Sequence, residues 1–207
     1  MQKTTLSHSR AYIYAQTSDL GSAPNPYGNM LSLAICKPLV RKNAQPGDMV
    51  LGITGSDLAK KRGYGIIWIG EVDQTISFNQ YHDSFPDRIP KINTWNWFTG
   101  DNIYTKTGNN FNQIPNPSHD ERSIEHDTKV DRVLIFKKFT YFGKKPLPID
   151  NSDSLTLDEI FGKGRIGHRT IPISHPLINS LSSQIEWLGR LNPPSDPLGS
   201  CKDPNSE

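Results

Sequence analysis

The chain has 207 residues, 34% of them hydrophobic, and its 23 Lys and Arg against 21 Asp and Glu leave a net charge of +2. This balance excludes a histone-like protein that coats nucleic acid with an overall basic surface, so any cationic binding site must be clustered. The length and the low hydrophobic share predict one compact domain with long loops over residues 1–191, followed by a disordered Pro- and Ser-rich tail over residues 192–207.

No membrane partner is expected. No stretch approaches the roughly 20 apolar residues that a membrane-spanning helix needs, and the polar residues 2–10 do not resemble a signal peptide. We therefore expect a cytoplasmic protein. The two cysteines, Cys36 in an apolar stretch and Cys201 in the polar tail, are not expected to form a disulfide. The sequence carries no indication of oligomeric state.

The first half of the chain predicts a sheet with one short helix. Four stretches are typical of strands, because their hydrophobic residues alternate or run together: residues 11–15, 31–36, 49–53 and 64–72. Pro38 suits the first turn of a helix up to Ala44. Residues 17–29, rich in Gly, Pro and Asn, are predicted to form an irregular loop with exposed amides that suit ligand contact. Residues 56–63 are predicted to form a basic loop.

The second half is predicted to hold short helices between long loops. Ser77 and Gln80 have the spacing of a capping box before a helix at residues 78–82. Residues 101–120 are predicted to form a long loop, of the kind that is usually functional or disordered. The remaining elements are expected to be a strand at residues 131–141, a helix at residues 157–161 that ends at Gly162, and a last helix at residues 174–188.

Cationic side chains gather in this sequence near turns set by Pro or Gly. Glycines at positions 162, 164 and 167 let a ligand approach the backbone closely, and the fork of an Arg side chain matches a phosphate. His168 could donate to a phosphate or to the edge of a base. The alternative interpretation is that these are solvated surface loops. The residues predicted to hold phosphates are Lys37, Arg41, Arg165 and Arg169.

Aromatic residues supply candidate walls for a base. Aromatic rings stack on bases, and an extruded base needs such walls. Trp95, Trp97 and Tyr104 lie in polar surroundings, so one or more of them is predicted to form a pocket, whereas Trp68 is expected in the core. The loop at residues 23–29 would complete the pocket, with Asn25 and Tyr27 as contacts.

A third group could carry acid/base chemistry. His119, Asp120 and Asp127 combine imidazole and carboxylates, which can move protons or bind metal. Their spacing matches no standard metal signature, so we expect neither a metal nor another cofactor. Cys36 is a weaker candidate nucleophile, because it lies in an apolar strand. A nucleophilic Ser motif, a Walker loop, a dinucleotide fingerprint and a Cys-x-x-Cys pair are absent.

Short motifs follow one another along residues 10–169 in an order that resembles a known family. These are Ala23-Pro-Asn-Pro-Tyr-Gly28, Cys36-Lys37-Pro38, Gly47-Asp48, Asp131-Arg-Val-Leu-Ile135, Tyr141-Phe-Gly143 and Gly164-Arg-Ile-Gly-His-Arg169. The chain resembles the second of the nucleotide-modification-associated domain families, found in bacteria and phages beside DNA base-modification genes. Its last motif departs from the family pattern Gly-Arg-Gly-His-Arg by the inserted Ile166.

Residues 31–72 also resemble the PUA-like superfamily, which includes the EVE, ASCH and YTH domains. This resemblance implies an α+β fold, with a small PUA-like β-barrel, flanking short helices and long loops. The family resemblance implies association with modified bases. We therefore expect the chain to bind DNA or a nucleotide, and to recognise a modified base through an aromatic pocket with a cationic rim.

Two other functions stay open. One is an enzyme of DNA base or nucleotide modification that uses His119, Asp120 and Asp127 as its acid/base group. The other is a nucleotide sensor or a partner subunit in a phage-defence system. The sequence does not choose among modified bases, or between DNA, RNA and a free nucleotide.

Overall fold

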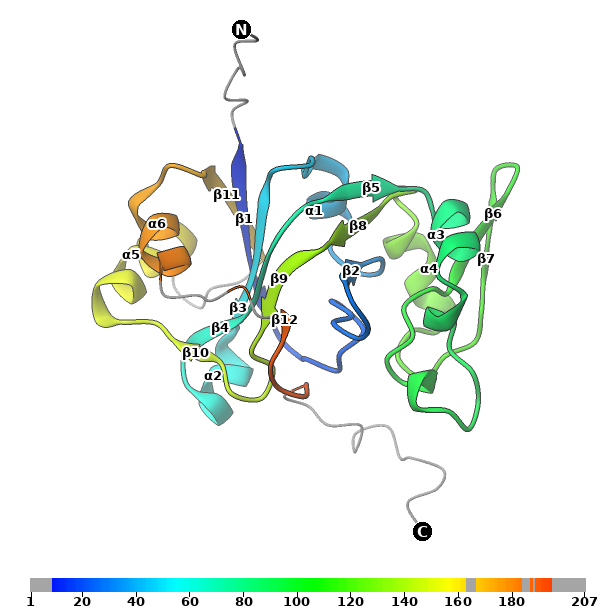
Figure 1. Cartoon of the computed structure of the whole chain (residues 1–207), viewed down its shortest axis with the longest axis horizontal. Coiled ribbons are helices and arrows are strands. Elements are labelled where there is room, and N and C mark those ends of the chain that lie inside the picture. The colour runs from blue at the N-terminus through cyan, green and yellow to red at the C-terminus, as the bar shows by residue number, and fades with distance from the viewer. Residues whose placement is uncertain (1–8, 163–166, 184–186, 188, 195–207) are drawn as a thin grey trace, which may run out of the picture.

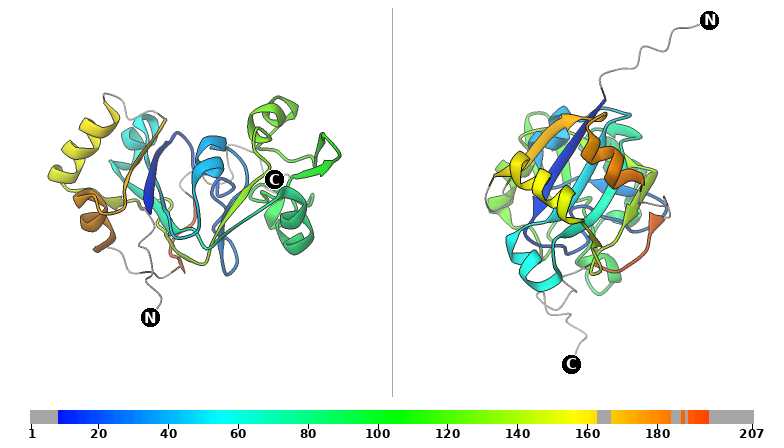
Figure 2. Two further views of the ribbon diagram at one scale, coloured as in Figure 1. Left: turned by 90° about the horizontal axis from the view of Figure 1, so that it is seen from above. Right: turned by 90° about the vertical axis from the view of Figure 1, so that its left-hand side faces the viewer.

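The computed structural model of the chain describes residues 9–162, 167–183, 187 and 189–194 (Figure 1). Two sheets lie face to face at its centre, and other elements cover the outer face of each sheet (Figures 1 and 2). Helices α5 (Asn151–Phe161) and α6 (Pro176–Ser183) cover one side. Helices α3 (Phe78–Ser84) and α4 (Glu121–Asp127) lie on the other.

The larger sheet has seven strands and holds the termini of the described fold. Its order is β11 (His168–Pro172), β1 (Arg10–Gln16), β3 (Met49–Thr54), β4 (Gly65–Glu71), β9 (Lys138–Tyr141) and β12 (Gly189–Arg190), with β10 (Leu147–Pro148) paired to β4. Strands β1 and β3 run parallel, whereas β1 pairs antiparallel with β11. Since both faces of the sheet are covered, its central strands are buried along almost their whole length.

The smaller sheet contains β2 (Leu31–Leu33), β8 (Val133–Phe136) and β5 (Gln74–Ile76). A separate hairpin joins β6 (Tyr104–Thr107) to β7 (Asn110–Gln113). Two short helices connect strands, α1 (Pro38–Asn43) after β2 and α2 (Ser56–Arg62) after β3. Single 3-10 turns occur at Pro86–Arg88 and Trp95–Trp97.

The alternation of side chains along β1 links the two sides of the larger sheet. Tyr12 and Tyr14 face the smaller sheet and pack in the core between the sheets. Ala11 and Ile13 point the other way, into the core beneath α5 and α6. Because successive side chains of a strand point to opposite faces, this one strand contributes to two cores and is fixed on both sides.

The α+β class is as expected, but the expected barrel does not form. Among the described residues, the larger sheet ends at β11 and β12, and the smaller sheet ends at β2 and β5. The strands thus form two packed sheets with open edges, and a PUA-like fold is not confirmed. The described part of the chain also contains no helix long and apolar enough to span a membrane.

Several expected elements are confirmed and others need correction. Helix α3 begins with the predicted capping box of Ser77 and Gln80. The predicted basic loop at residues 56–63 is helix α2, because Leu58 packs in the core and the remaining residues favour a helix. The predicted long loop at residues 101–120 contains the β6–β7 hairpin, and α5 starts at Asn151, six residues before the predicted 157. The tail from residue 195 lies outside the described residues.

Candidate functional site

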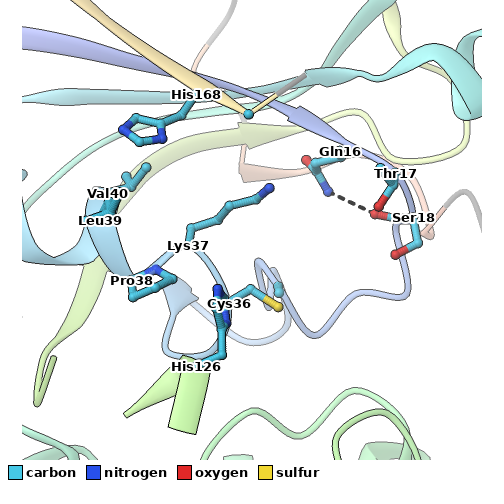
Figure 3. Close-up of a pocket in the computed structure, with 12 residues that line it drawn as sticks. Gln16, Thr17, Ser18, Cys36, Lys37, Pro38, Leu39, Val40, His126 and His168 are labelled. Atoms are coloured by element: carbon cyan, nitrogen blue, oxygen red, sulfur yellow. Dashed lines mark hydrogen bonds between the residues drawn. The ribbon is translucent and has the colours of Figure 1, made fainter. Parts of the chain in front are cut away.

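A cavity of about 330 Å³ lies where four distant parts of the chain meet (Figure 3). These parts are the end of β1, the turn between β2 and α1, the end of α4, and the start of β11. The polar residues that line the cavity are Gln16, Thr17, Ser18, Cys36, Lys37, His126 and His168. Ligand sites of proteins have volumes of several hundred Å³ and combine apolar walls with a few polar groups, so this cavity qualifies as one.

The turn that carries Cys36 and Lys37 has an unusual backbone. Both residues have left-handed conformations, with φ angles of 57° and 44°, which are costly for residues other than Gly. Hydrogen bonds hold the turn in place. Asp127 Oδ1 accepts from the Cys36 amide at 2.9 Å, and Arg41 Nε donates to the Cys36 carbonyl at 2.8 Å. Such stored strain occurs often at functional sites.

Arg41 connects the turn to the end of α4. Its side chain is fully buried, and its guanidinium also donates to the carbonyls of Asp127, Val130 and Arg132. Burial lowers the pKa of Arg41 to about 10, although nearby Asp127 opposes this shift. A phosphate would have to displace these bonds to reach Arg41. The predicted phosphate contact is therefore corrected to a role in positioning Cys36 and Asp127.

Next to the cavity, Cys36 meets His119 and Asp127. His119 Nε2 lies 3.3 Å from Cys36 Sγ and 3.5 Å from Asp127 Oδ2. Asp127 is buried, and it also accepts hydrogen bonds from Tyr104 OH at 3.2 Å and from His126 Nδ1, in the tautomer that protonates it, at 3.1 Å. Cys36 lies 83 positions before His119 in the chain, which is why no spacing motif indicates the whole cluster.

The protonation states follow from burial. Burial and then Asp127 raise the pKa of the Cys36 thiol to about 12, so the thiol is protonated at neutral pH. Burial lowers the pKa of His119, which is therefore neutral. One ring nitrogen, Nε2, faces both the thiol and the carboxylate. In a catalytic triad the two ring nitrogens face different partners, so the cluster does not have triad geometry.

Lys37 brings a positive charge into the cavity, and His168 adds an imidazole that can donate a hydrogen bond. The Lys37 side chain extends from α1 across the cavity towards β1, where Nζ lies 3.4 Å from the Ala15 carbonyl oxygen and 4.7 Å from the centroid of the Tyr14 ring (Figure 3). Burial lowers the pKa of Lys37. The pKa of His168 is lowered by burial first, and then by the positive charges of Lys37 and Arg169.

Arg169, one of the two predicted phosphate contacts in the C-terminal basic loop, lies among the described residues. It donates from Nε to the Ile160 carbonyl at 3.0 Å and from Nη2 to the Phe161 carbonyl at 2.9 Å. Its guanidinium therefore satisfies the C-terminal carbonyls of α5, on the opposite face of β11 from His168. Arg165 lies outside the described residues.

The predicted pocket residues do not form one cage. Asn25 is buried and donates to the Thr99 carbonyl and the Asp101 carboxylate, so it stabilises its loop from inside. Tyr104 is also buried, beside Asp127. Trp97 is half-buried.

Two of the predicted aromatics lie together at the surface. Trp95 is 61% exposed, and its ring centroid is 5.2 Å from that of Tyr27. The guanidinium of Arg190 lies 4.1 Å from the centroid of the Tyr27 ring. We call these three residues the aromatic surface. It offers one exposed indole on which a further ring could stack.

Of the predicted acid/base group, the structure brings together two members. His119 and Asp127 meet at Cys36, whereas Asp120 is exposed and binds Arg122 at 2.5 Å. The sequence assigned no role to two of the cavity residues, Gln16 and Ser18. It gave Cys36 only a weak role, as a candidate nucleophile. Pro38, two residues after Cys36 and at the start of α1, is the sequence signal that could have indicated the placement of Cys36 in a turn.

A family model described as nucleotide modification associated domain 2 matches residues 8–201, so the chain belongs to this family. The match agrees with the resemblance of the short motifs. It supports a role in nucleotide or DNA modification systems and is consistent with nucleic acid partners in general. No curated protein and no solved structure matches the chain.

Proposed function

We propose that this member of the family binds a nucleotide unit of nucleic acid, with its phosphate in the cavity beside Lys37 and a modified base on the neighbouring loop. Three observations support the proposal. The family is associated with nucleotide modification, the cavity has the volume and mixed lining of a ligand site, and the ammonium group of Lys37 extends into it.

The observation that carries this proposal is the ammonium group of Lys37. In the part of the chain that the structure describes, no carboxylate lies within ion-pair distance of it. A cation that is partly buried without a counter-charge is costly. A phosphate would supply the missing negative charge and accept a charge-assisted hydrogen bond from Lys37. His168, which also lines the cavity, would donate a second hydrogen bond to it.

The base would be recognised by the loop at residues 17–29. This loop lines the cavity at Thr17 and Ser18 and carries Tyr27 of the aromatic surface near its other end. Stacking on an exposed indole tolerates any base. The preference for a modified base would come from the polar groups of the loop and cavity, such as the Gln16 amide, which donates to the Ser18 carbonyl at 3.3 Å.

The test is a binding series by calorimetry at low salt. The ligands are nucleoside monophosphates and short single-stranded DNA with plain and modified bases. Lys37→Met should weaken binding about 10- to 100-fold, the value of a charge-assisted hydrogen bond. The control is Lys61→Met, which removes an exposed cation of α2 that does not line the cavity. Equal binding by both variants, or no binding of any ligand, contradicts the proposal.

Trp95→Ala tests the base contact in the same series. The loss of stacking should cost about 1–3 kcal/mol of binding free energy. Because Trp95 is exposed, its removal should leave the thermal unfolding curve nearly unchanged. Binding that is unaffected would place the base elsewhere.

An enzyme is the second candidate, and one observation favours it. His119 and Asp127 lie with Cys36 beside the cavity. They are two of the three residues that the sequence predicted as the acid/base group of an enzyme. Catalysis would convert the bound nucleotide. Mass spectrometry of the ligand after incubation would detect this, and His119→Gln should abolish the conversion while leaving binding by Lys37 intact.

A further inference from the structure

Three ligand-type atoms converge beside the cavity from separate parts of the chain. Cys36 Sγ lies in the turn between β2 and α1, His119 Nε2 just before α4, and Asp127 at the end of α4, with their ligand atoms all within 4.8 Å of one another. A thiolate, an imidazole nitrogen and a carboxylate oxygen are the donors that zinc takes in proteins.

The two separations measured from His119 Nε2 fit a single ion between the three groups. Zinc bonds of about 2.0–2.3 Å at tetrahedral angles place neighbouring ligand atoms about 3.4–3.6 Å apart. The observed separations from His119 Nε2 are 3.3 Å to Cys36 Sγ and 3.5 Å to Asp127 Oδ2. In the absence of an ion, Nε2 would have to carry the ring proton to meet the carboxylate and the sulfur as acceptors, whereas an ion would take its lone pair.

Surrounding hydrogen bonds hold each ligand in position. Asp127 Oδ1 accepts from the Cys36 amide, and Arg41 binds the carbonyls of both Cys36 and Asp127. The His119 amide donates to Asn116 Oδ1 at 2.8 Å. Metal ligands in proteins are commonly fixed by such outer contacts. Nδ1 of the His119 ring has no partner among the described residues, and it would carry the ring proton when an ion takes the Nε2 lone pair.

We propose that Cys36, His119 and Asp127 bind one zinc ion whose fourth coordination position faces the cavity. Three protein ligands with one open position are typical of catalytic zinc, whereas structural sites use four. Cys36 is both a ligand and a cavity residue, which places the open position on the cavity side. A water molecule would occupy this position. The site does not depend on nucleotide binding, because no ligand group of the nucleotide is needed to form it.

The test uses zinc and cobalt alone, without nucleotide. The full-length, untagged protein carries Cys201→Ser in every sample, so Cys36 is the one thiol left in the chain. After saturation with Zn²⁺ and removal of the excess, elemental analysis should give about one ion per chain. The Co²⁺ form should show a thiolate-to-cobalt charge-transfer band. Cys36→Ser should abolish that band, and His119→Gln should weaken metal binding at least about 10-fold.

Asp120→Asn is the matched control, because Asp120 is exposed and adjacent to His119 in sequence. It should bind metal like the parent. The proposal would be overturned if the parent bound less than about a tenth of an ion per chain. It would also be overturned if folded Cys36→Ser and His119→Gln variants bound the metal as tightly as the parent. If circular dichroism shows that a variant is unfolded, the result from the parent protein is used alone. A charge-transfer band in its Co²⁺ form supports the site, and the absence of this band overturns it. Nucleotide binding is measured separately, so either proposal can fail alone.

Discussion

His168 shows how a single residue reports on a ligand. Its pKa is lowered by burial and by the cations Lys37 and Arg169. A phosphate in the cavity adds negative charge and favours the imidazolium, so ligand binding should raise this pKa. Since the complex then binds more protons than the free protein, affinity should increase as the pH falls through the pKa of His168 in the complex.

An NMR titration of the His168 ring signals, with and without the nucleotide, measures both pKa values. Calorimetry at several pH values gives the matching affinities. His168→Gln should remove most of the pH dependence while Lys37 still binds. A His168 pKa that does not move when the ligand saturates the protein contradicts a phosphate at this place.

Arg41 is a second residue whose role follows from its surroundings. Its donors satisfy the partly or fully buried carbonyls of four residues, Cys36, Asp127, Val130 and Arg132. Each buried acceptor left unpaired costs about 1–3 kcal/mol, so Arg41→Met should lower the free energy of unfolding by roughly 3 kcal/mol or more. Lys42→Met, at the exposed neighbouring position of α1, should change it little. Urea unfolding of both variants measures this, and equal stabilities would contradict the positioning role.

Strand β11 shows how one element separates binding from stability. His168 pairs with Tyr14 of β1, whose ring faces the core between the sheets, and Arg169 pairs with Ile13, which faces α5. Adjacent side chains of a strand therefore serve different faces. The sequence showed only that two neighbouring hydrogen-bond donors come after Gly167, so it predicted a phosphate contact for Arg169 and a phosphate or base-edge contact for His168.

Arg169→Ala tests this division. The loss of hydrogen bonds to the Ile160 and Phe161 carbonyls should lower the free energy of unfolding by roughly 1–2 kcal/mol. Nucleotide affinity, in contrast, should change less than about threefold. His168→Gln should give the reverse pattern. A large loss of affinity in Arg169→Ala, without a loss of stability, would restore Arg169 as a phosphate contact.

Local patterns predicted most elements well. Alternation located β1 and β4, and a short apolar run located β3. The side chains of Ser77 and Gln80 located the start of α3. All these signals depend on neighbours in the chain. The start of α5 lies before the predicted residue 157, because Asp150 caps the helix and its side chain accepts from the Asp153 amide. Helix α2 was missed because charged side chains concealed its one buried contact, Leu58.

At the scale of the whole molecule, two features depend on contacts between residues that are distant in the sequence. These features are the arrangement of the two sheets and the cluster beside the cavity. The resemblance implied a barrel, but β2, β8 and β5 pair with one another and pack face to face on the larger sheet. The Cys36, His119 and Asp127 cluster depends on this packing, since residues 36 and 119 are 83 positions apart. Composition likewise did not reveal which cations are buried, and Arg41 is one of them.

The charge of the whole molecule predicts the salt dependence of binding. With a net charge of +2 and a cavity that offers Lys37 and His168, the protein would neutralise one or two phosphates. The affinity for single-stranded DNA should therefore fall with a slope of about −1 in a plot of log K against log salt. Calorimetry or fluorescence anisotropy at several salt concentrations measures this slope. A value near −5 would indicate a broad electrostatic surface that the cavity does not account for.

The central claim is that the cavity at the Cys36–Lys37 turn holds the phosphate of a nucleotide. A crystal structure of the chain with the tightest-binding nucleotide tests this most directly. The account predicts a phosphate oxygen within about 3 Å of Lys37 Nζ, the range of a charge-assisted hydrogen bond, with His168 as its second donor. A nucleotide bound at another surface, with Lys37 still directed at the Ala15 carbonyl, would contradict it.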